Sequence, residues 1–161
     1  MELDEFKQNF NGYGLTSEFI DLKYFQDNHA DYSQGFCLLA DNKAGLKTWS
    51  DNKDFSDRFM PFAQANGTGS TYGIWDDGTK KTLNDFPVIV FGDEGGVHII
   101  AENILQLMQI LTFDVEIMID FENANFYKDE DDYEESKDNP AYKSWLKECF
   151  NLDPTIKPKE I

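Results

Sequence analysis

Pro61-Phe-Ala-Gln-Ala-Asn-Gly-Thr-Gly-Ser-Thr-Tyr-Gly-Ile-Trp75 is the stretch of this sequence that decides the fold. Residues 60–65 and 71–75 are apolar and aromatic, and residues 66–69 between them supply asparagine and glycine. Two such runs joined by a short loop that contains glycine are typical of a β-hairpin. The sequence therefore predicts two antiparallel strands here.

Further turns on the C-terminal side extend this hairpin into a larger sheet. Asp76-Asp-Gly78 supplies a turn, and Pro87 precedes the apolar run of residues 88–91. The stretch Gly92-Asp-Glu-Gly-Gly96 then leads into residues 97–101. Glycine and aspartate at these positions favour turns, and proline is tolerated at the start of a strand. Three or four neighbouring antiparallel strands are expected.

The sequence before the hairpin predicts two short helices and one more strand. Leu3, Phe6 and Phe10 share a helical face before the Asn11-Gly12 break, and residues 15–25 repeat the spacing. Residues 35–40 form an apolar run followed by turn residues, as in a buried strand. Residues 54–59 are expected to form a short helical turn.

The sequence after the sheet predicts two helices and one ambiguous segment. Residues 104–111 carry an apolar face opposite polar residues, which indicates an amphipathic helix. Residues 115–121 fit a strand almost as well as a helix, and continuity with the preceding helix favours helix. Asn139-Pro140 is typical of a helix start, with an apolar stripe at Tyr142, Trp145, Leu146, Cys149 and Phe150. The prolines at 154 and 158 predict an exposed tail from about residue 153.

Length and composition indicate one α+β domain spanning residues 1–161. A chain of 161 residues with 40% hydrophobic content buries roughly 70% of its unfolded surface without disulfides or metals. The elements above predict a mostly antiparallel sheet flanked by helices. Cys37 and Cys149 are expected to be separate, buried and reduced. The acidic N-terminus and the lack of a long apolar stretch predict a cytoplasmic protein that does not contact the membrane.

The net charge of −17 constrains the class of partner. Nucleic-acid binding requires clustered cations, and Arg58 is the only arginine in the chain. A nucleic-acid ligand is therefore not expected. A strongly acidic surface instead attracts basic proteins at low salt, although solubility alone also accounts for acidity.

Several patterns suggest catalysis or metal binding, and each has a better structural explanation. The glycines of residues 67–73 lack dinucleotide-binding spacing and the Walker lysine, and Ser70 lies outside a nucleophile elbow. Cys37 lies in an apolar strand, where burial suppresses the thiolate that pairing with His29 or His98 would need. Two histidines are too few for a typical zinc site, and residues 129–135 lack the spacing of an EF-hand loop. No cofactor and no metal are expected.

Two enzyme hypotheses use carboxylates. Glu135-Ser-Lys137 matches half of a metal-dependent nuclease motif, with Asp120 as partner acid, but the triplet lies in a very hydrophilic segment and the charge repels the substrate. A small hydrolase is the remaining alternative. It would use Asp93, Glu94 and His98, which surround the glycine turn.

The hairpin, followed by Pro87-Val-Ile-Val-Phe-Gly-Asp-Glu-Gly-Gly96 and an amphipathic helix, resembles the SUKH superfamily. That superfamily includes yeast cell-wall synthesis regulators and bacterial toxin-immunity proteins. Residues 59–112 follow its order of motifs, whereas the first helix lacks the tryptophan and the Leu-Pro pair of better-known members. The resemblance implies a sheet flanked by helices. It also implies structural roles for a set of matched positions, which are Pro61, Phe62, Gly67, Gly69, Tyr72, Trp75, Pro87 and Gly92.

The resemblance implies a function in binding rather than in catalysis. Many bacterial members look like immunity proteins that neutralise a polymorphic toxin, often a nuclease, by occupying it. An acidic protein suits the basic cleft of a nuclease. The alternative within binding is a regulatory scaffold in envelope synthesis.

The acidic segment is the expected part of the interface with such a partner. It holds six acids and one tyrosine, which are Asp129, Glu130, Asp131, Asp132, Tyr133, Glu134 and Glu135. Acids attract a basic protein, and tyrosine is a common interface anchor. The acidity is also distributed along the chain, because −17 + 6 = −11 remains without this segment.

Overall fold

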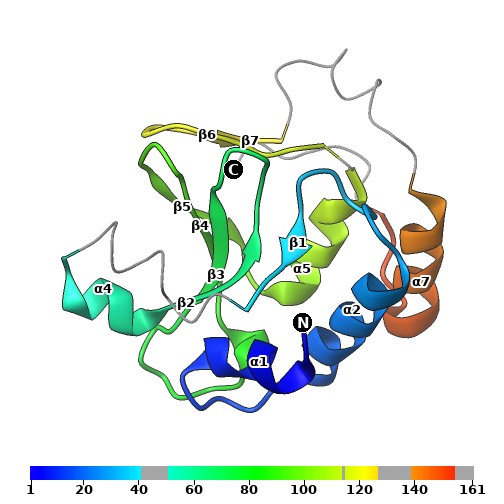
Figure 1. Cartoon of the computed structure of the whole chain (residues 1–161), viewed down its shortest axis with the longest axis horizontal. Helices are drawn as coiled ribbons and strands as arrows, with labels where there is room; N and C mark the ends of the chain where they lie inside the picture. The colour runs from blue at the N-terminus through cyan, green and yellow to red at the C-terminus, as the bar shows by residue number, and fades with distance from the viewer. Residues whose placement is uncertain (41–50, 114, 127–138, 155–161) are drawn as a thin grey trace.

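The computed structural model describes residues 1–40, 51–113, 115–126 and 139–154. A five-stranded antiparallel sheet with its strands in chain order lies at the centre. Most helices lie on one side of this sheet, and a ribbon of two further strands crosses one end of it (Figure 1). The predicted α+β class, with a mostly antiparallel sheet flanked by helices, is confirmed.

The four longest strands form a meander because local turns connect each strand to the next. They are β2 (Phe59–Gln64), β3 (Thr71–Trp75), β4 (Val88–Phe91) and β5 (Val97–Ala101). Each strand pairs antiparallel with its neighbour in the chain. The strands predicted from the hairpin and its following turns are therefore all present.

One further strand extends the sheet beyond β2. It is β1 (Cys37–Leu38), and Cys37 lies opposite Gln64. The strand predicted over residues 35–40 is present but shorter, because Leu39 and Ala40 are exposed and no longer belong to the sheet. The Leu39 amide still donates to the carbonyl of Phe62 at 2.8 Å, so one hydrogen bond to β2 remains beyond the end of β1.

The N-terminal helices follow the predicted breaks. They are α1 (Leu3–Lys7), the 3₁₀ helix η1 (Gln8–Phe10) and α2 (Ser17–Asn28). Asn11 and Gly12 both have positive φ, of 51° and 86°, which ends η1 and turns the chain towards α2. The two predicted helices are confirmed.

A short helix also precedes the meander. It is α4 (Lys53–Arg58), and it begins where the Asn52 side chain accepts the backbone N–H groups of Asp54 and Phe55 at 3.1 and 3.3 Å. The helical turn predicted over residues 54–59 is thus confirmed, with Phe59 already in β2.

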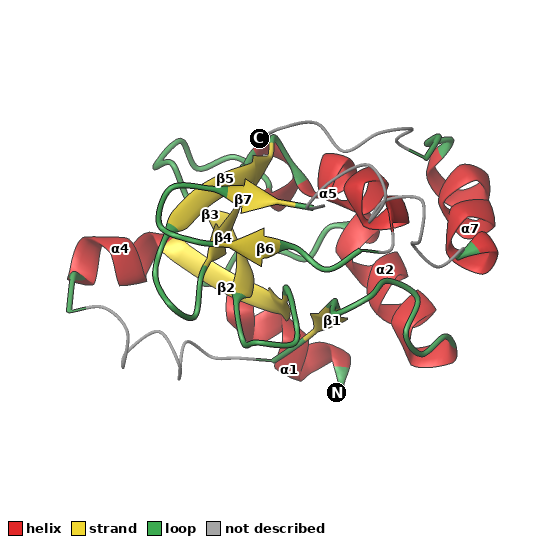
Figure 2. Cartoon of the chain, turned by 90° about the horizontal axis from the view of Figure 1, so that it is seen from above, coloured by secondary structure: helices red, strands yellow, loops and turns green. Residues whose placement is uncertain are grey.

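The C-terminal half contributes the rest of the helical layer. It holds η2 (Leu83–Asp85), α5 (Ile104–Ile110), η3 (Leu111–Phe113) and α7 (Pro140–Phe150). Helix α5 begins where the Asn103 side chain accepts the N–H of Gln106 at 3.0 Å. Helices α2, α5 and α7 lie on the same side of the sheet when the molecule is seen from above (Figure 2).

Aromatic side chains dominate the core between this helical layer and the sheet. Phe10 lies 5.0 Å from Phe19 and 6.2 Å from Phe62 between ring centroids, and all three are fully buried. Such ring pairs contribute about 0.5–1.5 kcal/mol beyond the area they bury. The apolar stripe of the N-terminal helices therefore packs directly on the hairpin.

The prediction that residues 115–121 continue as helix is wrong. The helical segment that begins with α5 ends with η3, and a small hairpin of β6 (Met118–Ile119) and β7 (Ala124–Asn125) follows. The Asp120 side chain accepts the N–H groups of residues 122 and 123 at 2.8 and 2.7 Å, and this local turn competes with the helix.

Two predictions about α7 also need correction. Asn139 directly precedes the helix, but its side-chain oxygen makes no capping hydrogen bond, and its side-chain N–H donates at 3.0 Å to the carbonyl of Tyr32. Cys149 is exposed rather than buried, since α7 packs through Tyr142 and Leu146 on another face. Both cysteines are free, as predicted, and Cys37 is half-buried.

Candidate functional site

Three turns meet at one end of the sheet, and Asn66 organises the first of them. The side-chain N–H of Asn66 donates to the carbonyl of Ile117 at 3.0 Å. Its carbonyl oxygen accepts the N–H groups of Thr68 and Ser70 at 3.2 and 3.1 Å and the Thr68 hydroxyl at 2.8 Å. The β2–β3 turn is thereby fixed to the segment that leads into β6.

The glycines of the β2–β3 turn have different roles. Gly69 has a φ of 110°, which confirms the predicted need for glycine in turn geometry. Gly67 lies in the same turn but does not have positive φ. Its N–H instead donates to the Glu116 carboxylate at 3.1 Å, and a Cβ at Gly35 would lie 2.6 Å from the same carboxylate oxygen. Glycine at position 35 leaves the room that this carboxylate occupies.

The second turn, between β4 and β5, is bonded to the first through Asp93. One carboxylate oxygen of Asp93 accepts the hydroxyl groups of Ser70 and Thr68 at 2.8 and 3.0 Å. The Ser70 hydroxyl oxygen accepts the Asp93 N–H at 3.2 Å in return. At Gly92, a Cβ would lie 2.3 Å from the carbonyl oxygen of Gly95, so the structural role implied for Gly92 fits this turn.

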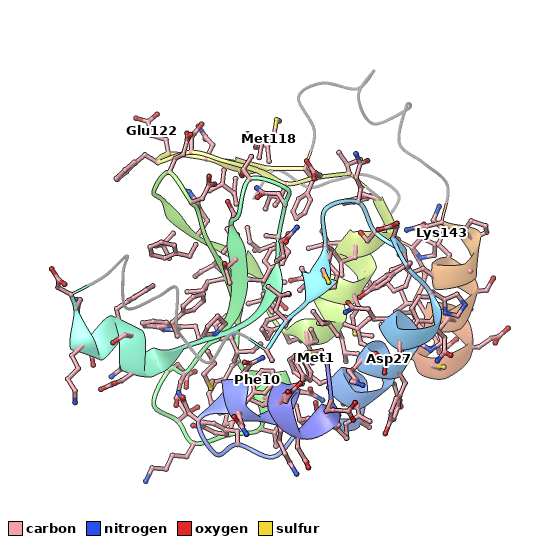
Figure 3. The ribbon with its side chains drawn as sticks, in the orientation of Figure 1. Met1, Phe10, Asp27, Met118, Glu122 and Lys143 are labelled. Carbon is pink, nitrogen blue, oxygen red and sulfur yellow. The ribbon has the colours of Figure 1, made fainter. Side chains whose placement is uncertain are left out.

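The third turn, between β6 and β7, packs on the β4–β5 turn. A His98 ring nitrogen lies 2.8 Å from the carbonyl oxygen of Asp120, and a Cβ at Gly96 would lie 2.3 Å from that same oxygen. A Cβ at Gly95 would lie 2.6 Å from the Phe121 ring. Glu122 lies at the tip of this hairpin, next to the β4–β5 turn, and Met118 lies further along it (Figure 3). The three turns therefore form one rigid end of the sheet.

The segment of residues 82–126, which contains β4, β5, β6 and β7, carries charge of one sign only. Residues 82–126 contain no lysine or arginine. They contain eight acids, which are Asp85, Asp93, Glu94, Glu102, Asp114, Glu116, Asp120 and Glu122. This segment of 45 residues therefore carries −8 of the net −17. Hydrogen bonds from the backbone N–H groups of Glu122 and Asn123 hold the pKa of Asp120 below its ordinary value, so this carboxylate stays ionised.

Exposed apolar side chains lie beside these acids. Val97 and Ile99 of β5 are 47% and 64% exposed, and Phe121 is 80% exposed. Val97 lies opposite Phe91 of β4, and Ile99 lies opposite Ile89. The alternating pattern of residues 97–101 predicts a strand. It does not indicate that this strand lies at the edge of the sheet, because the order of strands depends on the whole fold. Sequence reasoning therefore missed this surface.

The exposed residues of β5 continue a second apolar cluster on the outer face of the sheet. Phe59 and Ile89 are buried there, and Phe55, Trp75 and Phe91 are half-buried around them. Trp75 therefore packs in the cluster on the outer face and not in the main core. Phe62 and Tyr72 do lie in the main core, and the carbonyl of Pro87 accepts the Trp75 N–H at 3.0 Å. Pro61 lies in β2 opposite Gly73.

The residues of the hydrolase hypothesis do not assemble into one hydrogen-bonded group. Asp93 binds the hydroxyls of the β2–β3 turn, whereas His98 binds a backbone carbonyl of the β6–β7 turn. Glu94 is exposed beside them. The Ser70 hydroxyl is buried against Asp93, so no imidazole activates it as a nucleophile.

The thiol hypothesis finds no matching geometry among the described residues. Burial raises the pKa of the Cys37 thiol, which keeps it protonated at neutral pH. The His29 ring stacks on Phe25 at 4.1 Å between centroids, and His98 lies in β5 with its ring against the Asp120 carbonyl. Cys37 instead contacts the Gln26 amide at 3.6 Å.

Hollows also lie elsewhere on the surface of the described residues, among them two of different size. The larger, of about 590 Å³, is lined by Asn11, Gly12, Tyr13, Asp57, Asp76 and Lys80. Two hydrogen bonds join residues of its lining, because the Tyr13 hydroxyl donates to Asp76 at 2.8 Å and the Asn11 amide to the Asp57 carbonyl at 3.0 Å. The smaller, of about 320 Å³, lies beside Cys37 and Gln64. In the described part of the chain, no group of three or more His, Cys, Asp or Glu residues is placed to hold a metal ion.

Part of the predicted interface and tail lies outside the ranges that the structure describes. The acidic segment of residues 129–135 and the Glu135–Lys137 pair lie outside the described residues. The tail that was predicted from about residue 153 is described only as far as Pro154, and Asp153 and Pro154 are exposed. None of the described helices is long and apolar enough to cross a membrane.

Comparison of this chain with protein-family models, with curated proteins and with solved structures found no match. The geometry of the chain itself is therefore the basis for a function.

Proposed function

We propose that this protein is a cytoplasmic immunity-type protein that neutralises a basic toxin domain by binding it, without catalysing a reaction. The observation that carries this proposal is the end of the sheet around β5. Exposed valine, isoleucine and phenylalanine side chains lie there within a segment that has eight acids and no basic residue. Protein interfaces combine an apolar centre with a polar rim in this way.

The charge favours a basic partner over other classes of partner. Opposite charges steer two proteins together and raise association rates by about 10- to 1,000-fold, whereas this acidic surface repels a nucleic acid. A nuclease carries a basic cleft for its substrate, so an acidic protein that covers the cleft competes directly with that substrate. Inhibition then needs only occupancy of the cleft.

The resemblance to the SUKH superfamily supports the same proposal. Its matched positions have packing and turn roles here: Phe62 and Tyr72 are buried in the core, and Gly69 has positive φ. The catalytic alternative draws no comparable support, because Asp93 and His98 are bonded to different turns.

The test is affinity capture from source-cell lysate with the tagged protein, washed at low and at high salt and analysed by mass spectrometry. The captured protein is then expressed in cells with and without this chain. We expect a basic protein, released at high salt, that arrests growth unless this chain is present. A nontoxic envelope protein as the main partner would replace the proposal with the scaffold function, and capture of nothing at either salt would bring the hydrolase forward.

A matched pair of variants separates the acidic end of the sheet from overall charge. Glu94→Gln/Glu122→Gln and Asp4→Asn/Glu148→Gln each change the net charge from −17 to −15, and all four side chains are exposed. We expect the first pair to slow association with the captured partner and to flatten its salt dependence more than the second. Equal effects would mean that the partner senses only the overall charge. Amides in place of the six acids of residues 129–135 test the acidic segment in the same assay, and the same slowing is expected.

A further inference from the structure

Strand β5 forms an edge of the five-stranded sheet. It pairs with β4 on one side, and no described strand pairs with its other side. Strands β6 and β7 belong to a separate ribbon. An edge strand presents N–H and C=O groups to which another extended chain can add.

The sequence of β5 carries few of the features with which proteins protect an edge. Lysine and proline are absent from Val97-His-Ile-Ile-Ala101, and two of its β-branched side chains are exposed. The register shift in the pairing with β4 lies at the far end of the strand, so residues 97–99 keep regular pairing. Protected edges normally combine lysine, proline and bulges. Residues 97–99 are therefore suited to accept another strand.

The charge around β5 determines which chain can add. Asp93 and Glu94 are exposed before the strand, and Glu102 is exposed after it. A second copy of this protein would bring another −17 to the same edge, and like charges across an interface disfavour association. A segment with lysine or arginine at its ends matches these acids, and alternate apolar side chains match Val97 and Ile99.

We propose that β5 binds a short basic segment of a partner protein as an additional strand of the sheet. The inference rests on the proposed function, because it specifies how the basic partner is recognised. The added strand pairs its backbone with residues 97–99 and places apolar side chains beside Val97 and Ile99 on the outer face. At a rise of about 3.3 Å per residue, a segment of about five to seven residues reaches from the acids before β5 to Glu102.

The test uses purified protein and a display library of random linear peptides, so it does not depend on knowing the partner. We expect enrichment of peptides in which apolar residues alternate and lysine or arginine flanks them. In ¹⁵N NMR spectra of the protein, the enriched peptide shifts the amides of residues 93–102. Its affinity falls at least about tenfold for Val97→Lys/Ile99→Lys, because lysine at an edge opposes pairing and repels a basic peptide.

Two controls separate strand addition from adhesion to an apolar patch. Tyr24→Lys on α2 replaces another exposed large side chain, 51% exposed, and leaves affinity unchanged. N-methylation of the peptide amides that face β5 abolishes binding, because these amides donate hydrogen bonds to the sheet. N-methylation of the peptide amides on the opposite edge of the peptide, which do not bond to the sheet, leaves binding intact. Urea unfolding establishes that each variant is folded.

The outcomes also separate this inference from the proposed function. Failure to enrich any peptide, amide shifts elsewhere, or equal affinity of the β5 variant would overturn strand addition at β5. If a captured toxin still binds the β5 variant normally, the immunity function stands and this inference fails. If basic peptides add to β5 but no toxin is captured, the inference stands and the immunity function fails.

Discussion

Gly73 of β3 lies directly beneath the Phe59 ring, and replacing it with alanine should destabilise the protein strongly. A Cβ at position 73 would lie 2.0 Å from Phe59 Cε2, 2.5 Å from Cζ and 2.7 Å from Cδ2. Carbon atoms in contact prefer about 3.5–4.0 Å, so the ring must retreat by more than about 1 Å. Phe59 is 1% exposed and is enclosed by Phe55, Trp75 and Phe91, which leave it little room to move.

The expected magnitude follows from this confinement. Overpacking a filled core costs about 1–3 kcal/mol, and a close contact with a confined ring places Gly73→Ala near the upper end. With a urea m-value of about 2 kcal/mol/M, the unfolding midpoint should fall by about 1.5 M. Gly14→Ala is the matched control, because a Cβ there meets no atom within 4 Å and Gly14 does not have positive φ. It should change stability by less than about 0.5 kcal/mol.

A double-mutant cycle with Phe59→Ala tests the cause. That change alone costs about 3–5 kcal/mol, because it leaves a cavity. In the Phe59→Ala background, the methyl group of Gly73→Ala enters space that the ring has vacated. The double mutant should therefore lose about 1–3 kcal/mol less stability than the sum of the two single mutants. Additive costs, or a Gly73→Ala midpoint equal to that of the Gly14 control, would refute the reasoning.

Three further predictions concern polar and titratable side chains. Asn66→Ala should lower the free energy of unfolding by about 2–4 kcal/mol, measured in urea, because one side chain makes four hydrogen bonds at the sheet end; a loss below about 1 kcal/mol would contradict this role. Burial raises the folded-state pKa of Tyr72 and Tyr142 well above 10.0, the value in the unfolded chain. The contribution of these two groups to the free energy of unfolding should therefore be constant below about pH 9.5. Above pH 10 it should fall by about 1.4 kcal/mol per pH unit for each tyrosine. Urea midpoints together with phenolate absorbance test this, and full ionisation in still-folded protein at about pH 11 would contradict it. A thiol reagent should modify exposed Cys149 faster than half-buried Cys37, so Cys149→Ser should remove the fast phase of the reaction. A fast phase that persists in Cys149→Ser would belong to Cys37 and would contradict this prediction.

The fold could be predicted from the sequence wherever local chemistry decides the structure. The glycine and asparagine turns determine the meander from β2 to β5, and phenylalanine spacing identifies the helices before it. Local rules failed where a distant partner decides the outcome. The Asn139 side chain binds the carbonyl of Tyr32 instead of capping its own helix. In residues 115–121, the Asp120 turn and the bond from Asn66 to Ile117 stabilise a hairpin where helical periodicity was equally good.

The candidate site was less predictable than the fold. Acidity and the absence of arginine clusters are visible in the sequence and indicate the charge of the partner. The surface itself is not visible, because exposure of Val97 and Ile99 depends on β5 being the last strand of the sheet. Ile89, which lies opposite Ile99 in the next strand inward, is buried.

The proposal that this chain acts by occupancy is tested most directly by titrating the captured partner's toxic activity, such as nuclease activity, with purified protein. Binding predicts that activity falls linearly to zero at about one equivalent, does not change further with time, and returns when high salt dissociates the complex. Progressive inactivation by far less than one equivalent would show turnover by this chain, and undiminished activity at excess protein would show that it does not neutralise the partner; either result would contradict the proposal.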